Sequence, residues 1–419
     1  MVGIGGIGMS ALAQLLRHRG FEVSGSDREE SPVTMMLVQK GISVAIGHDV
    51  SNIPADCALL IYSDAVPSTN VERERAREMG IPEMSYFEAL GEVSKNARTI
   101  AVAGTHGKTT VTGMLAAILH DGRYEPTAIV GSIIKDFGSN FLPGKSDLLV
   151  VEACEYRDHL LKLSPDILVI TNLELDHTDY FPNLAALQET FRKAVERVPA
   201  HGAIITNPEL IHIAPILSGA KAKIIDYTHM AIGSLQLVGE FNRENARAAL
   251  AAAHKAFPDM SLEAGVRSLS KFHGSWRRFE YRGETPSGAQ VYDDYAHHPT
   301  AMKKTIFAAR EKFPDKRIVV AFHPHLYSRT RSFLKEFAEA LALADSAIVA
   351  PIYAAREAPD PTISHQILAD LAIDFGGDVV ALDSFDDIRD LLLKEDENSL
   401  IITMGAGDIY KVAEQIAGE

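Results

Sequence analysis

The chain has 419 residues, of which 46% are hydrophobic and 23% charged, and a formal net charge of −15 at pH 7. This is ordinary globular composition for a chain of roughly two to four domains, and three is our central expectation. The acidic balance argues against a non-specific nucleic-acid or anionic-membrane binder, because such proteins need a basic face. Two cysteines are too few for a disulfide scaffold, and we find neither a signal peptide nor an apolar run of roughly 18–20 residues, so we expect a soluble, cytoplasmic protein.

The first block, residues 1–96, opens on a glycine-rich turn, Gly3-Ile-Gly5-Gly6-Ile-Gly8-Met9-Ser10. A helix over 11–19 and a strand over 21–25 follow, and the strand runs into Ser26-Asp27. Glycines at this spacing let a backbone approach a pyrophosphate, and an acid about 20 positions later can meet a ribose hydroxyl. The pattern predicts a dinucleotide-type loop but does not separate NAD from other diphosphates.

Two more features of this block bear on that loop. Only Met1 and Val2 precede Gly3, so we expect a truncated first strand. An apolar strand over 58–63 ends in Ser63-Asp-Ala-Val-Pro67, which is a natural ligand loop at the carboxyl end of a strand.

The strongest pattern opens the second block, residues 97–272, with a short buried strand from Thr99 followed by Gly104-Thr105-His106-Gly107-Lys108-Thr109-Thr110 and a helix to about His120. Its two glycines let N–H groups converge, and the helix dipole points at the same place, so the turn can wrap an anion. Lys108, on what we expect to be an exposed loop, supplies charge for phosphates, and the Thr109 hydroxyl can hold Mg²⁺. Two residues rather than four separate the glycines, unlike a standard P-loop. We interpret the segment as an ATP site; an ordinary glycine-rich strand–helix turn is the alternative.

Two later strands should reach the same edge of the sheet. The strand 148–152 delivers Glu152 at its end, where a carboxylate can complete an Mg²⁺ shell, and the strand 166–171 leads to Asp176-His177. Continuous apolar runs indicate a mainly parallel sheet, whose strand ends lie together. Alone, Glu152 could be an exposed strand-end acid and His177 a capping or surface histidine, but together they predict metal or phosphate roles.

An alanine-rich helix over 242–257 closes the second block. Asn242 and Asn245 near its start could reach a nucleotide base, and an N-cap role is equally open for Asn242.

The third block, residues 273–419, is a further alternation of strands and helices. Trp276-Arg277-Arg278-Phe279 stands at its start, and Asp294-Tyr295-Ala296-His297-His298 runs from a strand end into a helix. The strand 317–322 leads into His323-Pro-His325-Leu326-Tyr-Ser-Arg329, and the last strand, 400–404, ends in Gly405-Ala-Gly407-Asp408. These histidines could simply cap helices; a zinc site is not favoured, because no ligand set of the usual spacing accompanies them.

In their order along the chain, these motifs resemble the Mur ligase family. They are GIGGIGMS with SGSD, AGTHGKTT, VVEACEY, NLELDH, FNREN, WRRFE, DDYAHHPTA, FHPHLYSRT and MGAGD. The resemblance covers essentially the whole chain and implies an α/β fold of three domains. These are a Rossmann-like UDP-sugar-binding domain (1–96), a P-loop-type ATP-binding domain with a mainly parallel sheet (97–272) and a Rossmann-like C-terminal domain (273–419).

The members it resembles most add the first amino acid of the peptidoglycan stem peptide. The resemblance therefore implies ligation of L-alanine to the carboxylate of UDP-N-acetylmuramate through an acyl phosphate, with ATP and Mg²⁺, in cytoplasmic peptidoglycan biosynthesis. It implies no nucleic-acid or membrane partner and leaves the oligomeric state open.

The resemblance also implies a role for each motif residue. The UDP-sugar residues are Gly5, Gly6, Gly8, Met9, Ser10, Asp27 and Ser63, and the metal ligands are Thr109, Glu152 and His177. The ATP residues are Gly104, Thr105, His106, Gly107, Lys108, Thr109, Thr110, Asn242, Asn245, Arg278 and Asp294, with Arg278 at the phosphates and Asp294 at the ribose. The amino-acid end comprises Tyr295, His297 and Arg329, and the catalytic residues are Lys108, His177, His297 and Arg329. Arg329 can hold a carboxylate with two hydrogen bonds, and His297 can accept the ammonium proton.

Three alternatives remain. A family member that attaches a whole tripeptide to the same sugar nucleotide would share every motif. An NAD-dependent oxidoreductase built on the first glycine loop would leave AGTHGKTT unexplained, and a non-catalytic sensor would bind both nucleotides without releasing phosphate. Leu326 stands where alanine-specific members often carry arginine, so the choice among alanine, serine and glycine stays open.

Overall fold

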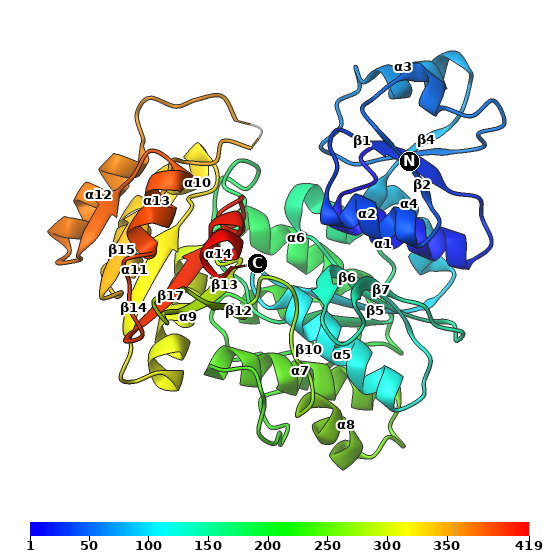
Figure 1. The fold of residues 1–419 in the computed structure, drawn as a ribbon. Helices are drawn as coiled ribbons and strands as arrows, with labels where there is room; N and C mark the ends of the chain where they lie inside the picture. Colours follow the sequence, from blue (N-terminus) through cyan, green and yellow to red (C-terminus); the bar gives the residue numbers. More distant parts are fainter. Residues whose placement is uncertain (356, 419) are drawn as a thin grey trace. The chain divides into compact units, whose positions relative to one another are not determined.

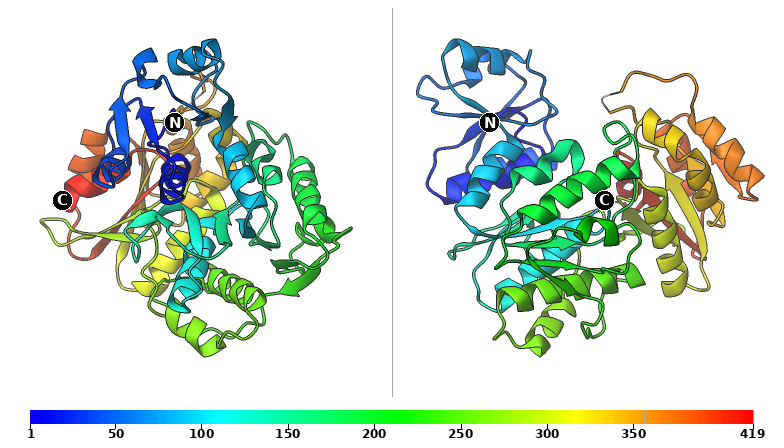
Figure 2. Two further views of the ribbon diagram at one scale, coloured as in Figure 1. Left: turned by 90° about the vertical axis from the view of Figure 1, so that its right-hand side faces the viewer. Right: turned by 180° about the vertical axis from the view of Figure 1, so that it is seen from behind.

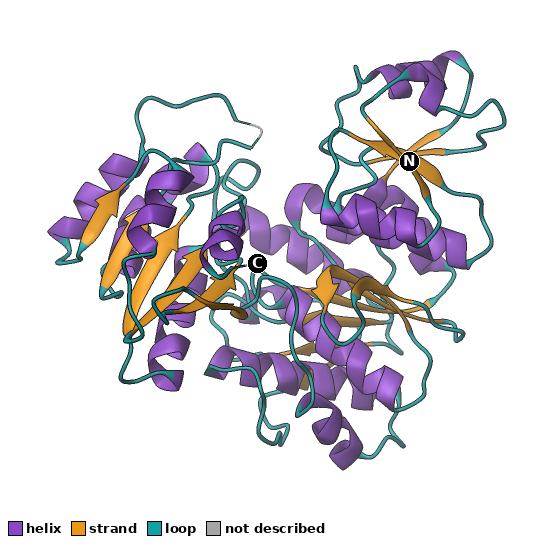
Figure 3. Cartoon of the chain, viewed as in Figure 1, coloured by secondary structure: helices purple, strands orange, loops and turns teal. Residues whose placement is uncertain are grey.

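The computed structural model describes residues 1–355 and 357–418, and its chain divides into two compact units. The first unit comprises Met1–Leu173, Leu187–Leu235 and Glu244–His273. The second comprises Glu174–Ala186, Gln236–Arg243 and Gly274–Glu419. Helices and strands alternate in both units (Figure 3), which confirms the predicted α/β class. Within the described residues, no helix is both long and apolar enough to cross a membrane.

A seven-stranded sheet forms the centre of the first unit, in the order β11-β10-β9-β5-β8-β6-β7. Only the β6–β7 pair is antiparallel, which confirms the mainly parallel sheet. All residues of β9 and β10 are buried; because successive side chains point to opposite faces, the sheet is covered on both. The strands are β5 (Arg98–Ala103), β6 (Thr127–Ile134), β7 (Ser139–Leu142), β8 (Leu148–Glu152), β9 (Ile167–Ile170), β10 (Ala203–Thr206) and β11 (Lys223–Asp226). The helical segments around them are α5 (Lys108–Asp121), η2 (Tyr156–Lys162), α6 (Leu184–Arg197), η3 (Ala214–Leu217), α7 (Glu240–Ala256) and α8 (Leu262–Leu269).

The register of this sheet brings the predicted phosphate loop and Glu152 to one edge. Val102 of β5 pairs with Glu152 of β8, and Ala103 of β5 pairs with Ile170 of β9. The loop after β5, the end of β8 and the residues after β9 are therefore neighbours, as parallel strand order requires. His177, the third residue expected at this edge, belongs to the second unit.

The N-terminal part of the first unit has two parallel strand pairs, which isolated bridges from Val2 to Ser26 and Tyr62 connect. Its strands are β1 (Ser24–Asp27), β2 (Ser43–Ile46), β3 (Leu60–Tyr62) and β4 (Glu83–Ser85). Its helical segments are α1 (Ile7–His18), α2 (Pro32–Gln39), η1 (Val50–Asn52), α3 (Val71–Glu78) and α4 (Tyr86–Lys95). Helix α1 begins at Ile7, earlier than predicted, because Gly6 caps it and its carbonyl accepts from the Ser10 N–H. This helix packs on β6 and β7 (Figure 1).

The second unit has a six-stranded sheet in the order β12-β13-β17-β14-β15-β16, parallel except for the edge strand β12. The unit has two hydrophobic cores. One includes residues of α9, α11 and α12, and the other includes residues of α13 and α14, as in a doubly wound fold with helices on both faces of the sheet. Helices α11 and α12 lie side by side (Figures 1 and 2). The strands are β12 (Glu280–Glu284), β13 (Gln290–Asp294), β14 (Arg317–Phe322), β15 (Ser346–Val349), β16 (Val379–Ala381) and β17 (Ser399–Met404). The helices are α9 (Pro299–Lys312), α10 (Tyr327–Ser332), α11 (Leu334–Leu341), α12 (His365–Asp374), α13 (Phe385–Leu392) and α14 (Tyr410–Ile416).

Candidate active site

The loop between β5 and α5 has a conformation that only glycine adopts easily. Gly104 has φ 129° and Gly107 has φ 82°. A Cβ on Gly104 would collide with Thr171 Oγ1, and one on Gly107 would collide with Asn245 Oδ1. Both the dihedral angle and the space therefore require glycine, and Asn245 lies against the loop.

Asn172, directly after β9, holds this loop in shape. The Thr105 N–H donates to the Asn172 carbonyl at 3.1 Å, and the His106 N–H donates to Asn172 Oδ1 at 2.9 Å. Asn172 Nδ2 and Thr171 Oγ1 in turn donate to the His106 carbonyl, at 3.0 and 2.6 Å. Only its place in the NLELDH motif marks Asn172 in the sequence, and that place does not indicate this role.

Lys108 is paired and mostly buried, so the expectation that it lies on an exposed loop is wrong. Its Nζ donates to the Gly104 carbonyl at 2.5 Å and to both oxygens of Glu155 at 3.0 Å. The Lys108 side chain is 14% exposed and that of Glu155 is 1% exposed. Burial alone would lower the pKa of Lys108, but the neighbouring carboxylates, chiefly Glu155, outweigh it and raise the pKa. Glu155 is not among the predicted site residues, and its only signal in the sequence is that it is the second acid of VVEACEY.

Thr109 and Glu152 lie together, as the sequence predicted. Thr109 Oγ1 donates to Glu152 Oε1 at 3.2 Å, and the Gly131 N–H donates to Glu152 Oε2 at 2.9 Å. A hydroxyl beside a carboxylate is the kind of oxygen set that suits Mg²⁺. Thr110, next along α5, is buried.

The first glycine loop contacts the acid and the strand-end loop that were predicted with it. The Gly5 N–H donates to Asp27 Oδ2 at 2.7 Å, and a Cβ on Gly3 would lie 2.9 Å from the Cβ of Ser63. The start of α1 therefore brings together four of the predicted residues, Gly5, Gly6, Asp27 and Ser63.

Met9 and Ser10 differ from this group, since both are buried within α1. The Ser10 hydroxyl donates to the Ile7 carbonyl and accepts from Asn140 Nδ2, both at 2.9 Å. These contacts favour a role in fixing α1 against β7 over direct contact with a ligand.

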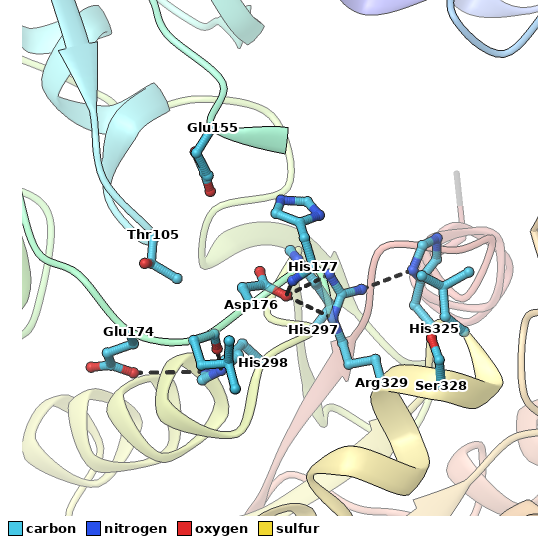
Figure 4. A network of polar contacts seen from close by, with 12 residues as sticks. Thr105, Glu155, Glu174, Asp176, His177, His297, His298, His325, Ser328 and Arg329 are labelled. Carbon is cyan, nitrogen blue, oxygen red and sulfur yellow. Dashed lines mark hydrogen bonds and ion pairs between the residues drawn. The ribbon is translucent and has the colours of Figure 1, made fainter. Parts of the chain in front are cut away.

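In the second unit, Arg329 and Asp176 form a buried ion pair (Figure 4). Arg329 Nη2 and Nε donate to Asp176 Oδ1 at 2.7 and 3.0 Å, and the two side chains are 3% and 6% exposed. Burial would raise the pKa of Asp176, but Arg329 and the neighbouring histidines hold it well below its usual value. Arg329 Nη1 lies 3.0 Å from His325 Nδ1, and because a guanidinium only donates, the His325 proton is on Nε2. Arg329 is therefore held in a fixed orientation.

His297 is neutral and has a defined tautomer. Burial and the charge of Arg329 hold its pKa well below 6.5. Its Nδ1 lies 2.9 Å from the Tyr295 carbonyl, which can only accept, so the proton is on Nδ1 and Nε2 carries the lone pair. The neighbouring His298 caps α9, because its side chain accepts a hydrogen bond from the Thr300 N–H. For this histidine, the alternative that it caps a helix is confirmed.

Asp294 and Asn242 make contacts within the protein. Asp294 accepts N–H groups from Phe279 and Ala296, each at 2.7 Å, and burial raises its pKa to about 6. Asn242 lies inside α7, and its Nδ2 donates back to the Val238 carbonyl at 2.8 Å, so it is not the N-cap of that helix.

The arginine pair of WRRFE divides into two roles. The Arg278 guanidinium lies 5.1 Å from the ring centre of Tyr295. Arg277, which is not among the predicted site residues, is buried and donates to Asp293 Oδ2 at 2.7 Å and to the carbonyls of Gly405 and Gly407 at 2.6 and 2.9 Å. It therefore ties the MGAGD loop to β13.

Comparison with known proteins gives matches along the whole chain. Residues 1–98 match the model described as "Mur ligase family, catalytic domain", residues 102–231 match "Mur ligase middle domain", and residues 277–407 match "Mur ligase, glutamate ligase domain". The UDP-N-acetylmuramate–L-alanine ligase of Agathobacter rectalis is 38% identical over 99% of this chain and 96% of its own length. The enzyme of that name from Caldicellulosiruptor bescii is 38% identical over 98% and 96%. The chain belongs to the Mur ligase family.

Solved structures agree with this membership. The UDP-N-acetylmuramate–alanine ligase of Thermotoga maritima superposes on this Mur ligase with a TM-score of 0.83 at 27% identity, covering 100% of this chain and 97% of that one. A murein peptide ligase from Psychrobacter arcticus gives a TM-score of 0.75 at 25% identity over 99% and 97%. The predicted family and fold are confirmed.

Proposed function

We propose that this Mur ligase uses ATP to join L-alanine to the carboxylate of UDP-N-acetylmuramate in peptidoglycan biosynthesis. The observation that carries the proposal is the preformed loop before α5. In this loop Lys108 pairs with Glu155, and the next residue, Thr109, contacts Glu152. Relatives that are 38% identical to this chain bear the name of this activity. We further propose that residues 1–96, 97–272 and 273–419 bind the UDP-sugar, the ATP and the amino-acid end, and that the enzyme acts in the cytoplasm.

The chemistry needs an activated acid, because a carboxylate is a poor electrophile. An oxygen of the muramoyl carboxylate attacks the γ-phosphorus of ATP, and ADP leaves with the electron pair of the broken bond. The alanine ammonium loses one proton, the resulting amine attacks the acyl carbon, and phosphate leaves with the electron pair of its bond; the nitrogen gives up a second proton and keeps the third as the amide N–H. Lys108 offsets the repulsion between the two anions, and Mg²⁺ held by the oxygens of Thr109 and Glu152, with His177, would add to that charge.

The second unit supplies the residues for the amine. His297 has its lone pair on Nε2, which is the atom we assign to take a proton from the ammonium. Arg329 is oriented by Asp176 and His325, and we assign it to the amino-acid carboxylate, with Tyr295 beside His297 at a ring-centre distance of 5.1 Å. Asn242, Asn245, Arg278 and Asp294 are proposed to complete the nucleotide site.

The tripeptide ligase remains the second candidate, because a murein peptide ligase is also a structural relative. Alanine is favoured, since the alanine ligase superposes with the higher TM-score and the relatives at 38% identity carry that name. An oxidoreductase or a sensor is disfavoured by membership of a ligase family.

The test is a phosphate-release assay with ATP, Mg²⁺ and UDP-N-acetylmuramate, with L-alanine, L-serine, glycine or the tripeptide as acceptor. We expect turnover with L-alanine and strict dependence on the sugar nucleotide and on Mg²⁺. Turnover with the tripeptide alone would establish the second candidate, and no ATP consumption with any acceptor would refute both.

A further inference from the structure

Tyr86 packs directly on the first glycine loop. It is the first residue of α4, and a capping box between Ser85 and Glu88 fixes its backbone. A Cβ on Gly8 would lie 2.6 Å from Cζ and 2.8 Å from the hydroxyl oxygen of Tyr86. A side chain at position 8 would therefore force the Tyr86 ring to move, which is a reason for glycine that the sequence pattern alone does not provide.

The ring of Tyr86 is held from its other side by an aromatic pair. Its centre lies 4.7 Å from that of Phe87 in a T-shaped contact, and Phe87 stacks on His159 at 3.6 Å. His159 Nε2 in turn lies 3.1 Å from Asp64 Oδ2, in the loop after β3. The position of the phenol is thus fixed by packing and does not depend on its own hydroxyl.

The Tyr86 hydroxyl is a donor without a partner. Among residues 1–355 and 357–418 it makes no hydrogen bond. Burial, followed by the charges of Glu152 and Cys154, raises the pKa of the phenol, so it keeps its proton at neutral pH. A neutral O–H does not repel an approaching carboxylate, whereas an ionised side chain of the same sign at this place would.

This hydroxyl lies against one of the two regions to which we assign different substrates, and the other is near enough for its charge to act on it. Gly8, at the start of α1 where the sugar nucleotide is proposed to bind, packs on the phenol, and Glu152, beside Thr109 at the phosphate loop, is among the charges that raise its pKa. The main-chain N–H groups at the start of α1 can serve the diphosphate without help from Tyr86. The carboxylate of the sugar nucleotide is the group that must pass from the first region to the second.

We propose that the Tyr86 hydroxyl donates a hydrogen bond to the carboxylate of the sugar nucleotide and positions it for phosphorylation. Tyr86 is then a positioning residue for the acid that is activated. The inference rests on the proposed function, because it requires a sugar nucleotide that carries a carboxylate.

The test compares the full-length wild type with Tyr86→Phe, which removes only the hydroxyl. Tyr124→Phe is the matched control, since Tyr124 stacks on Phe257 at 3.8 Å elsewhere in the same unit. Calorimetry gives Kd for UDP-N-acetylmuramate and for UDP-N-acetylglucosamine, which lacks the lactyl carboxylate. Tyr86→Phe should weaken the first roughly ten- to a hundredfold, as for a lost hydrogen bond to a charged group, and leave the second within about twofold.

Kinetics supply a second readout. In Tyr86→Phe, kcat should fall while the KM for ATP stays unchanged, and Tyr124→Phe should match the wild type in every measurement. Equal weakening of both nucleotides would assign the hydroxyl to the sugar or the diphosphate and overturn the proposal, as would no change in either. If the wild type neither binds UDP-N-acetylmuramate nor consumes ATP, the proposed function itself fails, and this inference with it.

Discussion

Removing Lys108 should destabilise the first unit as well as abolish turnover. In Lys108→Ala, the Glu155 carboxylate, 1% exposed, loses the ammonium that lies 3.0 Å from both its oxygens. Breaking one side of a buried ion pair costs roughly 3–5 kcal/mol, and we take about 3 because Glu155 can accept a proton. For a domain of roughly 150–250 residues, that corresponds to a fall in Tm of about 6–12 °C.

The assay is thermal unfolding at pH 7.5, with Glu155→Gln and the double variant as partners. Lys108→Ala/Glu155→Gln removes both charges of this pair, so it should unfold at a higher temperature than Lys108→Ala although it carries one more substitution. Both Lys108 variants should be inactive, which separates the stability effect from the catalytic one. The reasoning would be refuted if Lys108→Ala had the same Tm as the wild type, or if the double variant had a lower Tm than Lys108→Ala.

Three further predictions concern single residues. If His297 Nε2 is the base, His297→Ala should lower kcat roughly a hundredfold or more, and the wild-type rate should show no His297 titration from pH 6.5 to 8, because the pKa of His297 lies well below 6.5; a kcat in the variant equal to that of the wild type would contradict the role. Asp294 has its pKa raised to about 6 in the folded state, so its contribution to stability should decline as pH rises from about 4 to 6 and then level off. The Tm difference between wild type and Asp294→Asn, followed over that range, checks this sign. Gly8→Ala should displace the Tyr86 ring and weaken sugar-nucleotide binding measured as Kd, and the same change should cost less in a Tyr86→Ala background.

The sequence predicted those features that depend on local pattern. Continuous apolar runs identified the parallel strands, and parallel order alone placed Lys108 and Thr109 beside Glu152. The two glycines of the phosphate loop could be predicted because both have positive φ angles, which glycine adopts far more easily than other residues. These inferences need only spacing along the chain.

What the sequence could not provide were partners chosen by tertiary packing. Glu155 lies 47 positions from Lys108 and Asn172 lies 66 from His106, and nothing in either local pattern marks the pairing. The exposure of Lys108 was misjudged for the same reason, since a loop lysine is buried only when a distant acid meets it. Tyr86 and Arg277 are not marked by the local pattern either, because only the tertiary fold brings Tyr86 to Gly8 and Arg277 to Gly405 and Gly407.

The strand order of the second unit has a consequence for how the polypeptide matures. β17 (Ser399–Met404) follows the other strands of this sheet along the chain, but it lies in the middle of the sheet between β13 and β14. While the ribosome is still extending the chain, those two strands have no neighbour on their facing edges, and open edges of this kind are prone to pair with other molecules. The sheet can therefore close only after residues 399–404 have been synthesised, and a premature stop before residue 399 would remove its central strand.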